Sequence, residues 1–457
     1  MSFSENKITT KTDATPHPQP QLFELPPIGK RRLEISFTGE YLSSNGGLLL
    51  LKEAEKRVGI AKALSDCILD GRHPGYISHT HYDMTFQRVM QIAAGYEDAN
   101  DCNILRNDTV LKMCIDRAPV SGAPLASQPT MSRFENTPTN RELYRMAEAF
   151  LDNFMASYQA EPAVIILDAD DTNADVHGGQ QLSLFNDYYG EHCFMPLHIY
   201  EGFSRKLVTT ILKPGRRNKS ADVFAIIHRI IVRLRKRWKK TVIIVRGDGH
   251  FCSKELMDWS VGQPNTGFLT GLTGNAVLNR EVAGMIKSME DRFAHDKTPA
   301  KRYHSFSYKA ESWKIQQRVI AKVEVSEKGT NVRFVVTNLE YRTRALYEEV
   351  YCARGTMELC IKDHKTYLRS DRMSCSDFRA NQFRLFLHSA AYVLMHSLQH
   401  CMQETSNIPS LVMKTFRERY LKIATVVREL KTKVVVEFPR ACVEYIDIGK
   451  YLASLGY

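Results

Sequence analysis

The chain has 457 residues, more than one hydrophobic core usually organises, and this length favours two or three domains. Its 62 basic and 51 acidic residues give a formal net charge of +11, which permits a polyanionic partner without establishing one. Ten cysteines without a C-x-x-C pair or zinc spacing, and the lack of a long apolar run, predict a cytoplasmic protein with reduced thiols, no secretory signal and no membrane partner.

The first third of the sequence divides into two predicted regions. Residues 1–29 are polar and rich in Pro and Thr, and we expect them to be disordered. Residues 30–160 have a mainly helical pattern, in which Leu48 opens one helix after a Gly-containing turn. Thr139 and Glu142 form a capping box in front of another helix. We interpret residues 30–160 as a helical region.

At Val164 the pattern changes to short β-branched runs that are typical of buried strands. The predicted strands and helices follow in the order βββ-α-β-α-β-α, which is the order of a ribonuclease-H-like core, although several other α/β folds begin in the same way. The segments lie at 164–170, 193–200, 206–212, 221–240, 241–245, 254–260, 267–273 and 344–367. We therefore predict an α/β core made of residues 161–274 and 342–370.

Two further regions complete the predicted organisation. Residues 275–341 contain two strand-like runs, at 318–325 and 333–338, joined by a Gly-containing turn, and they predict a β-rich insertion before the last core helix. Residues 371–457 show a helical pattern again, and we interpret them as a C-terminal helical region.

An acidic cluster ends the first core strand. Side chains alternate along a strand, so Asp168 and Asp170 are expected on one face and Asp171 on the other. Two carboxylates on one face of a buried strand repel each other and resist desolvation, and a divalent cation removes both problems. The structural alternative is a solvent-exposed strand end or an Asx turn.

A second acidic position, Asp248, follows the apolar strand 241–245 in a turn flanked by glycines. Open α/β sheets bind their ligands at the carboxyl ends of the strands, which makes Asp248 a candidate site residue. Aspartate in a Gly-rich turn is also commonplace in proteins whose turn has no function.

A third group lies in the predicted helix 344–367. The intervals between Tyr351, Arg354, Glu358, Lys362 and Lys365 are three, four, four and three residues, which place all five side chains on one helical stripe. Taken alone, this stripe is more typical of a solvated face with weak ion pairs between neighbouring turns.

Together these positions resemble a known family. Tyr351-x2-Arg354-x3-Glu358-x6-Lys365 matches the Tyr-Arg-Glu-Lys signature of insertion-sequence transposases related to insertion sequence four. Further segments, in family order from about Leu33 to the C-terminus, resemble the insertion-sequence thirteen-eighty family. They are 46–51, 94–108, 125–136, 167–172, 188–190, 243–252, 333–339, 351–359 and 378–385.

The resemblance implies a bacterial, nucleoid-associated transposase of the Asp-Asp-Glu type with a ribonuclease-H-like core. In such an enzyme Asp170, Asp248 and Glu358 hold two Mg²⁺ or Mn²⁺ ions and catalyse DNA strand cleavage and strand transfer. The family places its first aspartate two residues before Thr172, which selects Asp170 and leaves Asp168 as the second choice of ligand. We expect the three catalytic carboxylates to converge although they lie far apart in the sequence.

The resemblance also implies DNA contacts near the cut. Tyr351, Arg354 and Lys365 are expected to bind phosphates, and Lys362 shares their face but lies outside the signature. Related hairpin-forming transposases carry in the β insertion a Trp that stabilises a flipped base, and Trp313 is the candidate here. The alternative places Trp313 in the core of the β-rich insertion.

The remaining partners follow from the same resemblance. They are double-stranded DNA, as the terminal inverted repeats of the transposon and as the target, and a second copy of the chain in a synaptic homodimer. Gln128 and Arg133, in a predicted helix with Pro at its first turn, are candidates to contact base edges. The alternative functions are a metal-dependent nuclease of the same fold and an inactive or domesticated transposase that only binds DNA.

Overall fold

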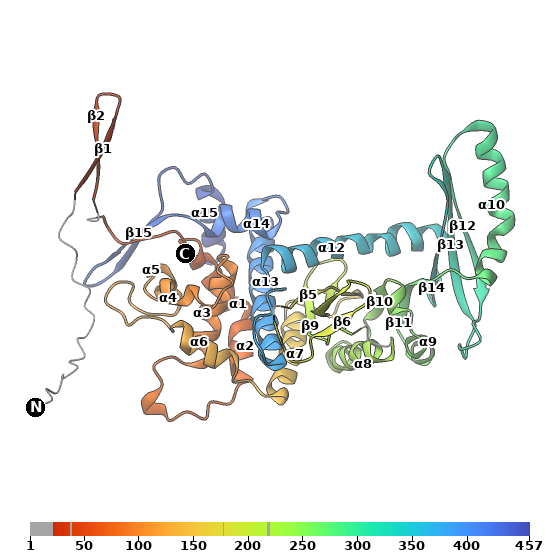
Figure 1. Cartoon of the computed structure of the whole chain (residues 1–457), viewed down its shortest axis with the longest axis horizontal. Coiled ribbons are helices and arrows are strands. Elements are labelled where there is room, and N and C mark those ends of the chain that lie inside the picture. Colours follow the sequence, from red (N-terminus) through yellow and green to blue (C-terminus); the bar gives the residue numbers. More distant parts are fainter. Residues whose placement is uncertain (1–21, 37–38, 177, 217–219) are drawn as a thin grey trace, which may run out of the picture.

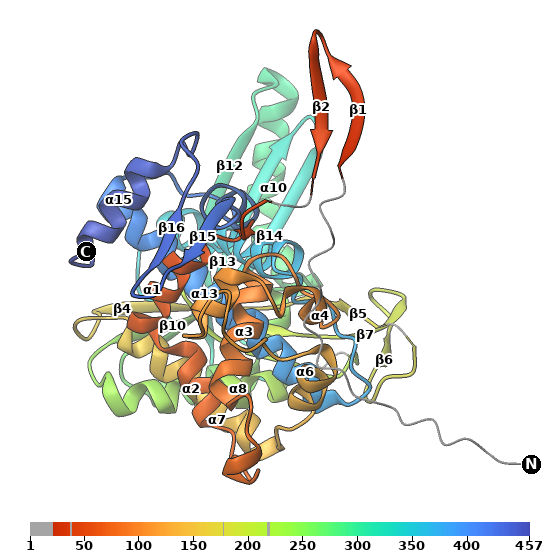
Figure 2. The same cartoon turned by 90° about the vertical axis from the view of Figure 1, so that its left-hand side faces the viewer.

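The computed structural model describes residues 22–36, 39–176, 178–216 and 220–457. Most of the expected disordered tail, residues 1–21, lies outside the described residues. The last residues of this tail form β1 (Phe23–Ile28), and the first residues of the region expected to be helical form β2 (Arg31–Ile35). The two strands make a hairpin that stands away from the body in both views (Figures 1 and 2). Cross-strand pairing of apolar residues, such as Leu25 opposite Leu33, explains why this part departs from the expected disorder.

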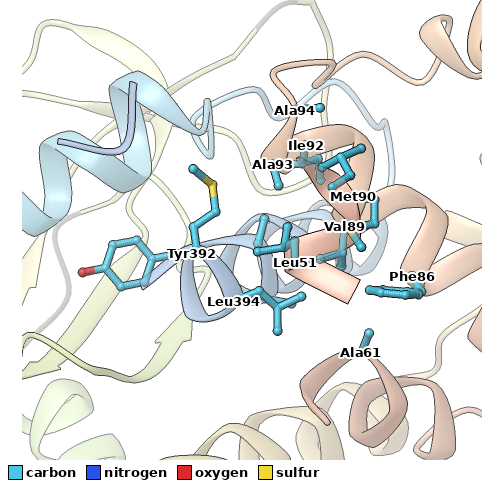
Figure 3. Close-up of a cluster of buried hydrophobic side chains, with 14 of the residues drawn as sticks. Leu51, Ala61, Phe86, Val89, Met90, Ile92, Ala93, Ala94, Tyr392 and Leu394 are labelled. Atoms are coloured by element: carbon cyan, nitrogen blue, oxygen red, sulfur yellow. The ribbon is translucent and has the colours of Figure 1, made fainter. Parts of the chain in front are cut away.

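The N-terminal region is helical, as its sequence pattern predicts. It contains α1 (Leu48–Val58), α2 (Ile60–Asp66), α3 (His81–Ala93), α4 (Asp101–Leu105), α5 (Thr109–Cys114), α6 (Gln128–Glu135) and α7 (Asn140–Ala156). The capping box of Thr139 and Glu142 is present at the start of α7. Figure 3 shows how Leu51, Phe86 and Leu394 pack together, so the core of these helices includes a segment from near the end of the chain.

That segment is α13 (Phe378–Ser406), which packs against α1, α3 and α15 (Tyr445–Ser454). The C-terminal region is less helical than expected, because it also contains β15 (Thr425–Glu429) and β16 (Val434–Glu437), which are rich in valine. β15 pairs with β16 on one side and with β3 (Leu42–Ser43) on the other. The two ends of the chain therefore share one hydrophobic core. No helix in the described part of the chain, α13 included, is long and apolar enough to cross a membrane.

A mixed eight-stranded sheet forms the centre of the α/β part, in the order β12-β13-β14-β11-β10-β4-β8-β9. β4 (Val164–Asp171), β10 (Val242–Gly247) and β11 (Thr266–Leu272) run parallel. β8 (Leu197–Glu201) and β9 (Leu207–Ile211) continue the sheet antiparallel beyond β4. α8 (Ser220–Arg237) connects β9 to β10, and α9 (Lys254–Val261) connects β10 to β11.

One expected strand is in fact two. The run 193–200 is divided between β7 (Glu191–Phe194) and β8, which belong to different sheets. Pro196 lies at the break, where a residue without a backbone N–H cannot continue a ladder. β7 pairs instead with β5 (Ala174–Asp175) and β6 (Leu184–Asn186) in a small sheet.

The segment after β11 contains more helices and strands than its sequence pattern predicts. It begins with α10 (Ala276–Asp296), a helix of 21 residues that we did not predict, and continues with three antiparallel strands where two were expected. The strands are β12 (Ala300–Tyr308), β13 (Gln317–Ser326) and β14 (Gly329–Thr337). Because β14 pairs with β11, these strands extend the central sheet into a lobe (Figure 1).

The two faces of the sheet have different neighbours. Ile165 and Leu167 of β4 pack in one core with residues of α7, α8, α9 and α10. The alternate residues of β4 face the helical segment 343–367, whose central turns are α12 (Gly355–Lys362) and whose two ends widen into π-helical turns. This segment runs from the helical region to the β12–β14 lobe (Figure 1), and so passes over the carboxyl ends of β4 and β10.

Candidate functional site

The first acidic residue of β4 is locked into a buried ion pair. Both carboxylate oxygens of Asp168 accept hydrogen bonds from Arg246 of β10, each at 2.5 Å, and both side chains are 1% exposed. Arg246 also donates to the carbonyl of Val350, which ties the sheet to the helical segment above it. Burial raises the pKa of Asp168, and the guanidinium of Arg246 opposes that rise. Both oxygens of Asp168 are thus occupied by Arg246, which leaves Asp170 as the more accessible of the two carboxylates.

Two residues further on, Asp170 makes a more open pair with Arg354. The distance from Asp170 Oδ2 to Arg354 Nη1 is 3.0 Å, and each side chain is 19% exposed. Burial raises the pKa of Asp170 to about 6, Arg354 opposes this rise, and the carboxylates of Asp248 and Asp171 add to it. As alternation predicts, Asp168 and Asp170 face the same helical segment.

Asp171 and Asp248 line the same cavity as Asp170, which has a volume of about 480 Å³. Asp171 faces the other side of the sheet and forms an ion pair with Lys213 at 2.6 Å. Asp248 follows β10, accepts a hydrogen bond from the backbone N–H of His250 at 2.8 Å, and keeps its side chain 34% exposed. Three carboxylates thus meet at one end of the sheet, balanced by the cations of Arg354 and Lys213.

Tyr351 reaches this end of the sheet from the helical segment. Its hydroxyl lies so close to Gly271 of β11 that a Cβ on Gly271 would come within 2.9 Å of it and within 2.8 Å of the Gly249 nitrogen. A side chain at position 271 would therefore displace the tyrosine or the turn that carries Asp248. Burial raises the pKa of Tyr351, the cation of Arg354 opposes this rise, and the charge of Asp248 adds to it.

The two lysines of the helical stripe have different surroundings. Lys365 Nζ lies 2.6 Å from Asn173 Oδ1 and 3.5 Å from Thr172 Oγ1, so it reaches the segment that follows Asp170 and Asp171. Lys362 Nζ lies 5.9 Å from the centre of the Tyr367 ring. Lys365 is thus the lysine that contacts the end of β4.

Glu358 does not complete a ligand group. It is exposed on α12, between Arg354 and Lys365 in the sequence. Among the residues that the structure describes, no three His, Cys, Asp or Glu side chains form a group that could hold a metal ion. The expected convergence of Glu358 with Asp170 and Asp248 is therefore not seen. Arg354 takes the place beside Asp170, as the mutual repulsion of carboxylates favours.

Trp313 and the α6 residues lie in other parts of the molecule. Trp313 packs on the core of the central sheet and meets Tyr308 edge to face at 5.3 Å. Arg133 is exposed on α6, whereas the backbone N–H of Gln128 donates to Asn103.

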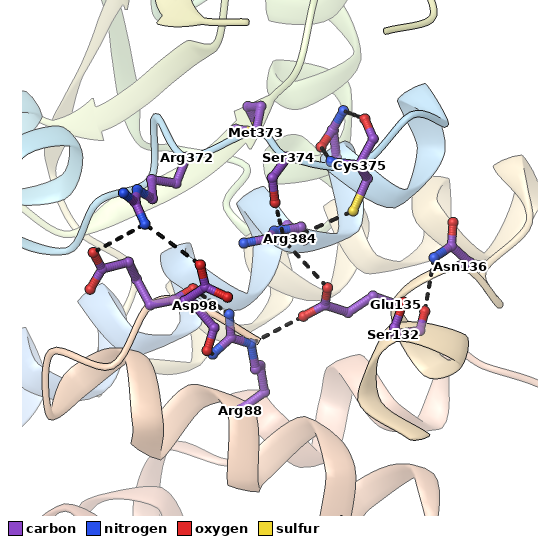
Figure 4. Close-up of polar contacts among 12 residues, drawn as sticks. Arg88, Asp98, Ser132, Glu135, Asn136, Arg372, Met373, Ser374, Cys375 and Arg384 are labelled. Atoms are coloured by element: carbon purple, nitrogen blue, oxygen red, sulfur yellow. Dashed lines mark hydrogen bonds and ion pairs between the residues drawn. The ribbon is translucent and has the colours of Figure 1, made fainter. Parts of the chain in front are cut away.

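A buried charge network holds α6 in place (Figure 4). Glu135, the last residue of α6, is 2% exposed and lies between two arginines of neighbouring helices. Its carboxylate is 3.0 Å from Arg88 of α3 and 3.6 Å from Arg384 of α13. Breaking such a pair leaves an uncompensated buried charge, so the network fixes α6 and the outward direction of Arg133.

Comparisons with known proteins identify the family of this chain. The family described as transposase DDE domain group 1 matches residues 25–456, nearly the whole chain. The chain belongs to this transposase family. No curated protein matches this transposase. A cryo-EM structure of the piggyBac transposase synaptic complex with hairpin DNA resembles it at 12% sequence identity and a TM-score of 0.43, over 81% of this chain and 78% of that chain.

Sequence reasoning missed two cations of this transposase, Arg246 and Lys213. Arg246 did leave a signal, because an arginine inside an otherwise apolar strand requires a buried counter-charge. The parallel pairing of β10 with β4 places Arg246 directly beside Asp168, and this register supplies that charge. Lys213 lies two residues after β9 and has no comparable signal in the sequence.

Proposed function

We propose that this transposase cuts and joins DNA, and that β4, β8, β9, β10 and β11 form a ribonuclease-H-like catalytic core. The observation that carries the proposal is the meeting of Asp170 and Asp248 at the carboxyl ends of adjacent parallel strands, within a chain of the DDE transposase family. The strand order β9-β8-β4-β10-β11, in which only β8 runs antiparallel to the other four strands, supports this core.

The described residues supply part of a binding site for divalent cations. Asp170 and Asp248 supply the oxygen donors that Mg²⁺ or Mn²⁺ prefers. Burial, and to a lesser degree the carboxylates of Asp248 and Asp171, raises the pKa of Asp170, and a bound cation would favour its charged form. We propose these two residues as ligands and Glu358 as the third, carried by the helix that already reaches β4 through Arg354 and Lys365. Bound divalent ions supply activation of the attacking oxygen and stabilisation of the leaving oxygen.

The cationic residues have the complementary role. Arg354 offers a planar fork and Lys365 a point charge, and we propose that both bind phosphates of the strand being cut. Arg354 would exchange its bond to Asp170 for a bond to phosphate, which frees the carboxylate. Tyr351, held against Gly271 beside Asp248, would orient the same phosphate through its hydroxyl.

The substrates follow from this chemistry. We propose that the chain recognises the terminal inverted repeats of an insertion sequence of the thirteen-eighty type, acts as a homodimer, and transfers the freed 3′-hydroxyl to target DNA. Exposed Arg133 on the fixed helix α6 is our candidate for base contact, and residues 275–341 are the insertion into the core.

The test is Asp248→Asn in the full-length protein. Asparagine keeps the size of the side chain and removes the anionic oxygen, so strand cleavage and joining in Mg²⁺ should fall to background while DNA binding stays within about three-fold of wild type. The assay uses a duplex with the DNA that flanks the gene and separates nicked, cut and joined products on a gel. Cleavage near the wild-type rate would refute the proposal, and cutting without joining would identify a nuclease.

A further inference from the structure

Two tyrosines of unassigned role stand at the mouth of the catalytic cavity. Tyr188 and Tyr189 lie in the turn between β6 and β7 and line the cavity together with Asp170 and Asp248. Their rings meet edge to face at 4.9 Å, and the residues are 80% and 37% exposed. Aromatic rings that remain in water contribute little to folding, so the exposure of Tyr188 and Tyr189 suggests that the rings bind a ligand.

The turn that carries them is firmly built. Asn186 is 4% exposed, and its side-chain amide donates to the carbonyl of Gly215 at 2.7 Å. Its side-chain oxygen accepts from the backbone N–H groups of Tyr188 at 3.0 Å and Tyr189 at 3.4 Å. Gly190 closes the turn with a φ of +70°, which favours glycine. The two rings are therefore held outward by a fixed backbone.

The neighbouring charges indicate what these rings contact. Carboxylates and the cation of Lys213 line the cavity, and Arg354 pairs with Asp170 of its lining, which suits a phosphodiester and its ions. The base of the same or the next nucleotide must lie beside that phosphodiester, and its flat face is the natural partner of an exposed aromatic ring. Trp313 differs, because its ring already packs on Tyr308 and on the core of the sheet.

We propose that Tyr188 and Tyr189 form a stacking platform for a nucleobase of the DNA strand that enters the cavity. This inference rests on the proposed function and adds to it the way the strand is held. Stacking accepts any base, so the platform supplies affinity and positioning without sequence preference.

The experiment compares two probes of equal charge on the full-length protein. One is a single-stranded thymidine oligonucleotide of about 12 nucleotides, and the other is an abasic strand of the same length. Affinities are measured by fluorescence anisotropy for the wild type, Y188A/Y189A and Y188F/Y189F. Tyr445→Ala, which removes a 67% exposed tyrosine of α15, is the matched control. Melting curves show whether each variant is folded.

We expect the wild type and the phenylalanine variant to bind the thymidine strand more tightly than the abasic strand. In Y188A/Y189A this preference should fall by roughly five-fold to a hundred-fold, the usual contribution of one stacked base, with unchanged affinity for the abasic strand. An unchanged preference in a folded alanine variant overturns the platform. If the wild type has the preference but never cleaves duplex DNA, the proposed function fails while the platform stands.

Discussion

Two aspartate–arginine pairs lie on the same face of β4, two residues apart, in very different environments. Asp168 and Arg246 are both 1% exposed and joined by two hydrogen bonds, whereas Asp170 and Arg354 are 19% exposed and joined by one. The first pair connects two strands of the sheet, and the second connects the sheet to a helix. Residue type alone does not distinguish them.

The difference teaches that burial and the number of bonds decide which pair is available for chemistry. Exchanging the Asp168–Arg246 pair for other ligands would require desolvated charges to separate, which costs several kcal/mol. Asp170 lines an open cavity, so water, phosphate or a cation can replace its bond to Arg354 at lower cost.

The largest effect is expected for Arg246→Met, which removes the cation and leaves Asp168 as a buried, uncompensated carboxylate. We expect the free energy of unfolding to fall by about 3–5 kcal/mol. Urea denaturation of the wild type and the variant measures this. The control is the double variant Asp168→Leu with Arg246→Met, which should recover most of the stability because no buried charge remains. If Arg246→Met unfolds at the wild-type urea concentration, the pair has no structural importance.

Glu55 of α1 shows what happens to a buried carboxylate without an arginine. It is 3% exposed, one oxygen accepts from the backbone N–H of Lys62 at 3.0 Å, and burial raises its pKa to about 7. The unfolded chain titrates near 4.5, so the folded state binds the proton more tightly. Stability is then fully present below pH 4.5 and is lost as the pH rises to about 7, by roughly 3 kcal/mol.

Glu55→Gln tests this pH dependence. Glutamine cannot ionise, so the difference in unfolding free energy between pH 5 and pH 8 should shrink by roughly 3 kcal/mol relative to the wild type. Urea denaturation at both pH values measures it. An identical pH dependence in the two proteins would show that Glu55 titrates normally, and that burial without a cation does not perturb it.

The sequence predicts the local elements of this molecule better than the contacts between distant segments. The β-branched run at Val164 and the apolar run before Asp248 locate β4 and β10, because strand patterns are local. The pairing of Asp168 with Arg246 depends on strand register, which the sequence does not specify directly. The sharing of one core by α1 and α13 is a long-range contact with no local signal.

The candidate site also combines features with a local sequence signal and features that depend on contacts between segments. The spacing of the helical stripe predicted correctly that Arg354 and Lys365 lie on one side of the helix, since both reach the end of β4. The spacing does not predict how the described His, Cys, Asp and Glu side chains group around a metal ion, because that depends on how the helix packs on the sheet. α10 was missed because the residues after Asn275 were interpreted together with the strands that follow.

Arg354→Ala tests the more open pair. If Arg354 binds a phosphate, the slope of log affinity against log KCl concentration for duplex DNA should become shallower by about 0.9, with slower cleavage and unchanged sequence preference. The free energy of unfolding should change by no more than about 1 kcal/mol, because the pair is partly exposed. Arg344→Ala is the control, since Arg344 pairs with Glu348 earlier in the same segment. An unchanged slope with normal cleavage would remove Arg354 from the site.

The smallest effect on folding is expected for the two lysines of the helical stripe, and comparing them tests which side chains of the stripe act in cleavage. Lys365 contacts Asn173 and Thr172, which follow Asp170 and Asp171, whereas Lys362 lies near the ring of Tyr367. Lys365→Ala should slow cleavage by about ten-fold or more, the usual contribution of a hydrogen bond to a charged group, while Lys362→Ala should leave the rate unchanged. Both variants should melt within about a degree of the wild type, because surface charges contribute little to stability. Cleavage rates under single-turnover conditions measure the difference. A solvated helical face without function predicts equal and normal rates for both variants, so equal rates would remove Lys365 from the site and leave Tyr351, Arg354 and Glu358 to connect the helix with the reaction.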